Sequence, residues 1–169
     1  IEQRTGIRVE ILSNSEQRFL DYKSIASKGE MFRRIIEEKT AILDIGGGSI
    51  QISLFEKDTL VSTQNLRLGV LRLQELLNHL NAGSTQMEKL VDELATAQLD
   101  DYKKLYLKER EIQNIIIVDD YLSPWAVRRA HERGEENAVV DSKVFAGLME
   151  ALRTKGTTEL AKRMDITEE

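Results

Sequence analysis

Residues 40–55 read TAILDIGGGSIQISLF, and this stretch decides the fold. A short apolar run, 42–45, is interrupted only by Asp44. Residues 50–55 then alternate between apolar and mainly polar side chains, which is the period of a β-strand. The residues between the two runs are Gly46, Gly47, Gly48 and Ser49. The stretch therefore predicts a strand, a glycine turn and a second strand.

The composition of this turn is suited to binding phosphate. Consecutive glycines allow positive φ angles and a close approach of the backbone to a ligand, because no Cβ is in the way. Successive backbone N–H groups form a concavity for phosphate oxygens, and the Ser49 hydroxyl adds a donor. A carboxylate at Asp44, inside an apolar strand, favours a partner such as Mg²⁺. The alternative from the residues alone is a plain hairpin turn that Asp44 caps.

Composition limits the class of protein. The chain has 169 residues, of which 41% are hydrophobic and 31% charged, as expected for one globular domain. A net charge of −5 gives no general affinity for a nucleic acid polymer or an acidic membrane, and the absence of cysteine excludes disulfides and thiolate metal sites. No apolar run is long enough for a spanning helix and no signal peptide is evident, so we expect a cytoplasmic location. The first residue is Ile1 rather than methionine, which suggests a piece of a longer protein.

The remaining pattern predicts an α/β or α+β domain with a mixed sheet. Alternation predicts a strand at 7–12, and Ser15 is the expected cap of a helix that extends to about residue 27 with Leu20 and Tyr22 on its inner face. Further expected elements are a helix at 31–39, a strand at 60–68, helices at 69–80 and 85–109, a strand at 114–118, and helices over 123–133, 141–152 and 157–164. The apolar run 114–118 is typical of a parallel strand covered on both faces.

Three segments together resemble one enzyme family. The string DIGGGSIQISLF resembles the phosphate-binding hairpin of the actin-like ATPase and sugar-kinase superfamily. Together with TGIRVEILSNSEQRFL at 5–20 and LRLGVLRLQEL at 66–76, it is similar to the exopolyphosphatase / guanosine pentaphosphate phosphohydrolase (Ppx/GppA) family. The resemblance is strong to about residue 77 and collinear through 169.

This resemblance implies an α/β domain of the ribonuclease H-like fold within a two-domain enzyme. Its sheet would be mixed, with helices packed on it. Residues 1–169 would form a single domain equivalent to the second of the two. The enzyme would remove the terminal phosphate of polyphosphate or of guanosine pentaphosphate with Mg²⁺, and family members commonly form homodimers. Asp44 would organise the metal, and the substrate phosphate would be held by Gly46, Gly47, Gly48 and Ser49.

Three positions depart from the family pattern. The glutamate taken as catalytic base aligns with Gln17, although its neighbour Glu16 is retained, and an active-site glutamate just past the glycine turn is replaced by Gln51. An amide does not accept a proton from water at neutral pH. The family's second phosphate loop is replaced by Asp119–Ser123, in which Asp119 and Asp120 would repel phosphate unless they bind a metal.

Three hypotheses remain open. The first is a working hydrolase in which Glu16 serves as the base, or in which Asp119 or Asp120 helps to hold metal. The second is a degenerate relative, a sensor or regulator that binds polyphosphate or a guanosine polyphosphate without cleaving it rapidly. The third is a scaffold for protein association. The candidate catalytic residues are thus Glu16, Gln17 and Gln51.

Overall fold

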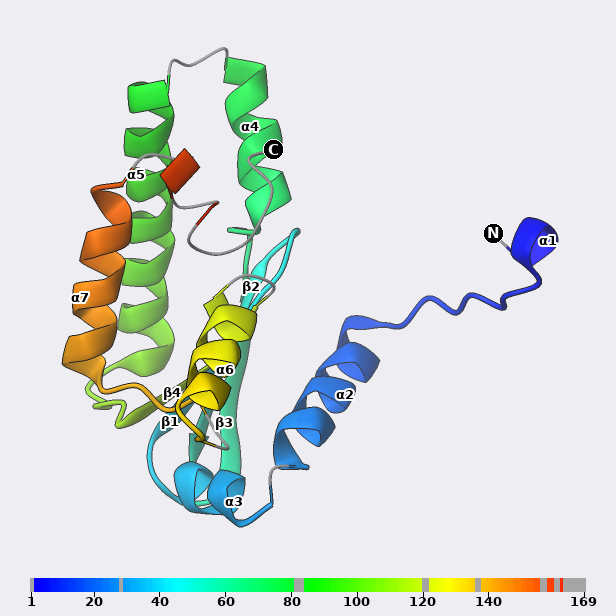
Figure 1. Cartoon of the computed structure of the whole chain (residues 1–169), viewed down its shortest axis with the longest axis vertical. Coiled ribbons are helices and arrows are strands. Elements are labelled where there is room, and N and C mark those ends of the chain that lie inside the picture. Colours follow the sequence, from blue (N-terminus) through cyan, green and yellow to red (C-terminus); the bar gives the residue numbers. More distant parts are fainter. Residues whose placement is uncertain are drawn as a thin grey trace.

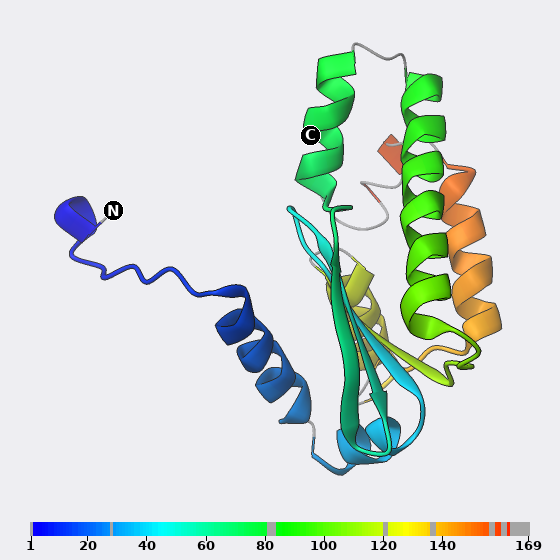
Figure 2. The same cartoon turned by 180° about the vertical axis from the view of Figure 1, so that it is seen from behind.

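A computed structural model shows a four-stranded sheet with helices on both faces and a helical layer beyond one end (Figures 1 and 2). It describes residues 2–27, 29–80, 84–119, 122–135, 138–155, 158–159 and 162. The helix expected at 157–164 and residues Asp120 and Tyr121 lie largely or wholly outside this description.

The described elements follow one another in this order: α1 (Glu2–Thr5), α2 (Asn14–Ala26), α3 (Glu30–Glu37), β1 (Thr40–Ile45), β2 (Ile50–Glu56), β3 (Thr59–Leu66), α4 (Val70–Leu80), α5 (Ser84–Tyr102), the π-helix η1 (Lys103–Leu107), β4 (Asn114–Asp119), α6 (Leu122–Glu132) and α7 (Ser142–Arg153).

The sheet is mixed, as predicted. Its strand order is β3-β2-β1-β4, with β1–β2 and β2–β3 antiparallel and β1–β4 parallel. The β1–β2 register pairs Ile45 with Ile50, so the glycine turn joins the two strands directly. The carboxyl ends of β1 and β4 therefore lie at the same end of the sheet as this turn. In open α/β sheets ligands bind at that end of parallel strands.

Two apolar clusters hold helices to opposite faces of the sheet. On one face Ala41, Ile52 and Leu54 pack with Tyr102, where α5 passes into the π-helix. On the other face Ile42 packs with α3 and with part of α2; the buried members there are Phe32, Ile36 and Ile42. The strand period of two assigns neighbouring residues of β1 to different clusters. Burying each large aliphatic side chain contributes about 1.5–3 kcal/mol.

Several predicted details are wrong for physical reasons. Residues 7–12 form no strand, and Ile7, Val9 and Ile11 are 63%, 52% and 97% exposed. Figure 1 shows this segment running away from the sheet. A segment of alternating apolar and polar residues forms a strand only where another strand supplies hydrogen bonds. None of the four described strands lies beside residues 7–12.

Two further expectations need correction. The N-cap of α2 is Ser13 and not Ser15, and Leu20 on α2 is half exposed instead of internal. Ile115 on β4 is 61% exposed, because β4 pairs only with β1 and forms an edge of the described sheet. The prediction that this strand is buried on both faces of the sheet is therefore wrong at Ile115. No helix among the described residues is long and apolar enough to cross a bilayer.

Candidate functional site: a glycine turn docked on a helix

The glycine turn lies directly below the first residues of α4 (Figure 1). It is closed by the Gly46 amide, which donates to the Ser49 carbonyl at 3.0 Å. Its carbonyls in turn accept hydrogen bonds from the start of α4. The contacts are Val70 N to Gly46 O at 3.4 Å, Leu71 N and Arg72 N to Gly47 O at 3.0 and 3.2 Å, and Arg72 Nε to Gly48 O at 3.0 Å. The turn therefore satisfies N–H groups that a helix start leaves without intrahelical partners.

These contacts fix the direction of the turn's own amides. In a trans peptide the N–H of one residue points opposite to the C=O of the residue before it. Because the carbonyls of residues 46, 47 and 48 face α4, the amides of Gly47, Gly48 and Ser49 face away from it. None of these three amides donates to another residue in the part of the chain that the structure describes. Three successive outward amides form the concavity that binds anions.

Close approach explains Gly69 and, through the Leu71 side chain at 2.9 Å, Gly47, but neither close approach nor positive φ explains Gly46 or Gly48. The expectation of positive φ is wrong: in the described chain the glycines with positive φ are Gly6, Gly29 and Gly134. The tightest position is Gly69, where an added Cβ would lie 2.2 Å from the Gly48 carbonyl carbon. At Gly48 itself a Cβ would meet nothing within 4 Å. Sequence reasoning missed Gly69 as a site residue, although a glycine directly before a helix is a recognisable signal.

A row of polar side chains lies beside the turn. In the register Asp44 pairs with Gln51, which pairs with Asn65 on β3. Paired residues in adjacent strands share a face of the sheet, and the alternation places this row on the face where Ile42 meets α3. The structure therefore brings the predicted residues Asp44 and Gln51 together with the glycine turn.

The residues at this row fit one mode of binding Mg²⁺. No group of three or more His, Cys, Asp or Glu side chains that could hold a metal occurs among the described residues. Mg²⁺ is, however, often held by one or two carboxylates together with substrate phosphates and water. One carboxylate at Asp44, next to an anion-binding turn, is a donor set of that kind.

The other two predicted catalytic residues lie on α2, a separate element (Figures 1 and 2). Glu16 forms a capping box with Ser13: its Oε2 accepts from Ser13 N and Ser13 Oγ, both at 2.8 Å. These hydrogen bonds hold the pKa of the Glu16 carboxyl below its usual range. Such a group is a weak proton acceptor near neutral pH. Gln17 is exposed one residue further on.

Asp119, in the loop that departs from the family pattern, has a structural contact of its own. Its carboxylate accepts hydrogen bonds at the start of α6, from Leu122 N at 2.5 Å, Ser123 N at 3.0 Å and Ser123 Oγ at 2.6 Å. A carboxylate at a helix N-terminus is stabilised by the orphan N–H groups and the helix dipole. This capping accounts for a carboxylate here without a metal, and Asp120 lies outside the described residues.

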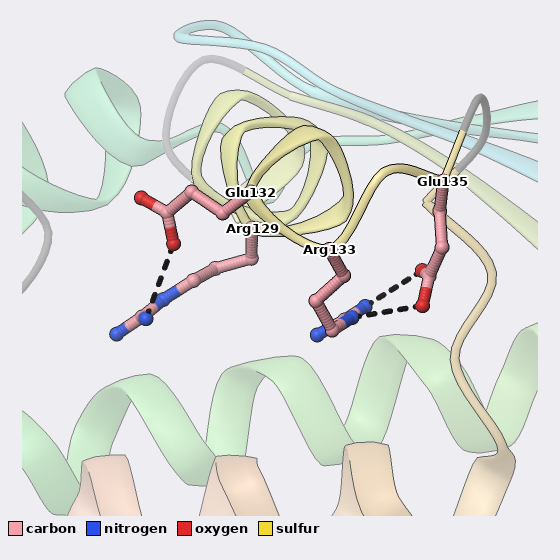
Figure 3. Close-up of polar contacts among 4 residues, drawn as sticks. All are labelled: Arg129, Glu132, Arg133 and Glu135. Carbon is pink, nitrogen blue, oxygen red and sulfur yellow. Dashed lines mark hydrogen bonds and ion pairs between the residues drawn. The ribbon is translucent and has the colours of Figure 1, made fainter.

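A second group of charges, on α6 and after it, is explained by surface ion pairs (Figure 3). Arg129 pairs with Glu132 at 3.3 Å, and Arg133 binds Glu135 through Nε and Nη2, each at 2.9 Å. These bonds lower the pKa of Glu135 and raise that of Arg133. All four side chains are about half exposed, so solvent screens the pairs.

Comparisons with known proteins agree with this fold. The chain matches a family model described as the Ppx/GppA phosphatase family over residues 1–158. A crystal structure of the Aquifex aeolicus Ppx/GppA family member has a TM-score of 0.61 at 14% identity, and the match covers 97% of this chain and 52% of that chain. A structural study of the Aquifex aeolicus PPX-GPPA enzyme gives a TM-score of 0.51 at 13% identity, covering 78% and 44%.

These likenesses show a shared fold, and the chain spans about half the length of the solved structures it matches. No curated protein is a significant match to the chain. The family model, however, covers most of the sequence. The chain therefore belongs to the Ppx/GppA phosphatase family.

Proposed function

We propose that this chain binds a phosphate group of polyphosphate or guanosine pentaphosphate at the glycine turn, within a complete protein that hydrolyses the terminal phosphate. The observation that carries the proposal is the run of three outward amides at Gly47, Gly48 and Ser49, held by the contacts of the turn with α4. Preorganised backbone donors stabilise phosphoryl oxygens without reorganising during the reaction. Family membership supports the substrate class.

In this proposal Asp44 is the residue that holds Mg²⁺. When bound, Mg²⁺ neutralises charge on the phosphate oxygens and orients the group to be transferred. Asp44 and Gln51 are direct partners in the register of β1 and β2, one residue pair from the turn. The chain itself contributes the backbone amides that fix the phosphate, the carboxylate of Asp44 and the side-chain amide of Gln51, which can donate a hydrogen bond but does not remove a proton.

The proposal extends to the whole protein. We infer that residues 1–169 are equivalent to the second of two ribonuclease H-like domains, as the sequence resemblance implies. The matched structures are about twice as long as this chain, which supports an assignment to one of two domains. A cytoplasmic location and a homodimer of the complete protein are part of the same prediction.

A second candidate is a protein that binds the same ligands but cleaves them slowly. It is favoured by the capping box, which engages the Glu16 carboxylate with Ser13 and lowers its pKa. Gln17 and Gln51 do not replace that base, since both are amides. Catalysis would then require a base other than these three residues.

Phosphate release by the full-length protein tests both candidates. Long-chain polyphosphate and guanosine pentaphosphate are supplied with Mg²⁺, and inorganic phosphate is measured for the natural protein and for Asp44→Asn. We expect release above the enzyme-free blank and a loss on the order of 10²-fold in Asp44→Asn. Asp58→Asn is the matched control, because Asp58 is an exposed carboxylate in the β2–β3 turn, whose amide instead contacts α3.

The outcomes separate the hypotheses. Equal loss in both variants would contradict a role for Asp44. Saturable binding without release would favour the slow-cleaving candidate. Neither binding nor release would contradict the proposal and leave the scaffold hypothesis.

A further inference from the structure

The side chain of Arg72 is attached to the glycine turn. Arg72 is the third residue of α4, and its Nε donates to the Gly48 carbonyl at 3.0 Å, while its backbone N donates to the Gly47 carbonyl at 3.2 Å. The residue is exposed. One arginine therefore contacts two of the three peptides whose amides form the anion-binding concavity.

The location of this arginine is unfavourable for helix stability. The start of a helix carries a partial positive charge, so carboxylates stabilise the first turn and cations destabilise it. The first turn of α4 contains no acidic residue. Among the described residues no carboxylate forms an ion pair with Arg72, although other exposed arginines, such as Arg129 and Arg133, have such partners. Local violations of a stabilising rule concentrate at functional sites.

The contact also polarises one peptide group of the turn. A guanidinium bound to the Gly48 carbonyl polarises the peptide that joins Gly48 to Ser49, and polarisation along a hydrogen-bond chain strengthens the N–H donor at its other end. That donor is the Ser49 amide, which faces away from α4. The guanidinium also places a positive charge beside the turn in a chain whose net charge is −5.

We propose that Arg72 is a positioning and specificity-determining residue of the anion site. It holds the Gly48–Ser49 peptide with its N–H toward the ligand, and its positive charge selects multiply charged phosphate chains over singly charged anions. This inference rests on the proposed binding of phosphate at the glycine turn, and it adds a residue that the sequence analysis did not single out.

Calorimetric titration of the full-length protein with sodium tripolyphosphate, at several NaCl concentrations, tests the role. Arg72→Lys keeps the charge, and Arg72→Gln keeps an N–H donor without charge. Arg34→Met is the matched control, since it removes an exposed cation from α3, at the other end of the sheet (Figure 1). We expect Arg72→Gln to weaken binding about 10-fold or more and to flatten its salt dependence, while Arg72→Lys stays within about 3-fold of the natural protein.

Each result has a definite meaning. If Arg72→Gln binds as tightly as the natural protein, or if Arg34→Met loses as much affinity, the inference is wrong although the turn still binds phosphate. If Arg72→Gln retains affinity and Arg72→Lys loses it, the contact is structural and the charge has no role. If the natural protein itself does not bind tripolyphosphate, the proposed function fails and the inference fails with it.

Discussion

At the scale of single residues, the most constrained position of the site is Gly69. Its Cα lies so close to the glycine turn that a methyl group would come within 2.3 Å of three backbone atoms, namely Gly48 C, Ser49 N and Gly47 O. Backbone atoms cannot move aside as a flexible side chain can. Glycine at 69 is therefore what permits α4 to begin on the turn.

Gly69→Ala should separate the turn from α4. We expect a loss of about 3 kcal/mol or more in the free energy of unfolding, at the upper end of overpacking effects, and a loss of phosphate affinity. Denaturant unfolding followed by circular dichroism measures the first. Gly48→Ala is the control, because a Cβ there has open space and φ is not positive. Equal stability of the two variants would show that the contact of the turn with α4 is looser than described.

At the scale of elements, the two turns of the three antiparallel strands are each tied to a helix end. The glycine turn offers carbonyls to the N-terminus of α4. The opposite turn, Lys57–Asp58, offers its amides to the last carbonyls of α3, with Lys57 N on Glu37 O at 3.2 Å and Asp58 N on Ile36 O at 3.0 Å. A helix start has spare donors and a helix end has spare acceptors, so each turn satisfies the groups that its helix lacks.

Among the described side chains of α2, Tyr22 and Ile25 pack against the sheet and α3, and Tyr22 also forms a hydrogen bond with a strand. The Tyr22 hydroxyl donates to Ser53 Oγ at 2.5 Å, and its ring meets Phe55 edge-on, with centroids 5.5 Å apart. Ser53 is 1% exposed and shares a second hydrogen bond with Thr63 at 2.9 Å. Tyr22 and Ile25 therefore hold the second half of α2 against the sheet and α3, and Glu16 lies about two turns earlier in the same helix.

Replacing Tyr22 should loosen α2 without unfolding the sheet. Tyr22→Phe removes one hydrogen bond, worth about 1 kcal/mol, and should speed hydrogen exchange in α2 about five-fold. Tyr22→Ala removes the ring as well and should have a clearly larger effect. Exchange measured by mass spectrometry, with β1 and β2 peptides as internal reference, checks this. Identical exchange in α2 for all three proteins would contradict the dependence.

The elements also show what the sequence predicts well. The strands around residues 40–56 were predictable because an apolar run and a period-two segment flank the glycine turn, and both strands contain buried residues. The same period at 7–12 failed, since Ile11 has no strand beside it. The choice of Ser15 over Ser13 as N-cap failed because both serines fit the composition, and only the reciprocal contact with Glu16 distinguishes Ser13.

At the scale of the molecule, the candidate site occupies one end of the sheet. The glycine turn, the row that contains Asp44 and Gln51, and the start of α4 meet there. The glycine turn and the place of Asp44 beside it were predictable from the sequence, and the binding role of Asp44 stays a prediction. The contacts of Gly69 and Arg72 with the turn were not predictable, because they depend on the approach of α4 to a turn about twenty residues earlier in the chain.

The binding of phosphate by the turn is the central claim, and backbone amide resonances report on it directly. We would titrate tripolyphosphate into the ¹⁵N-labelled full-length protein with Mg²⁺ and follow the amides of Gly47, Gly48 and Ser49. The account predicts saturable shifts, largest at these three amides, which Gly69→Ala abolishes. Saturation accompanied by shifts elsewhere, with these three resonances unchanged, would contradict it.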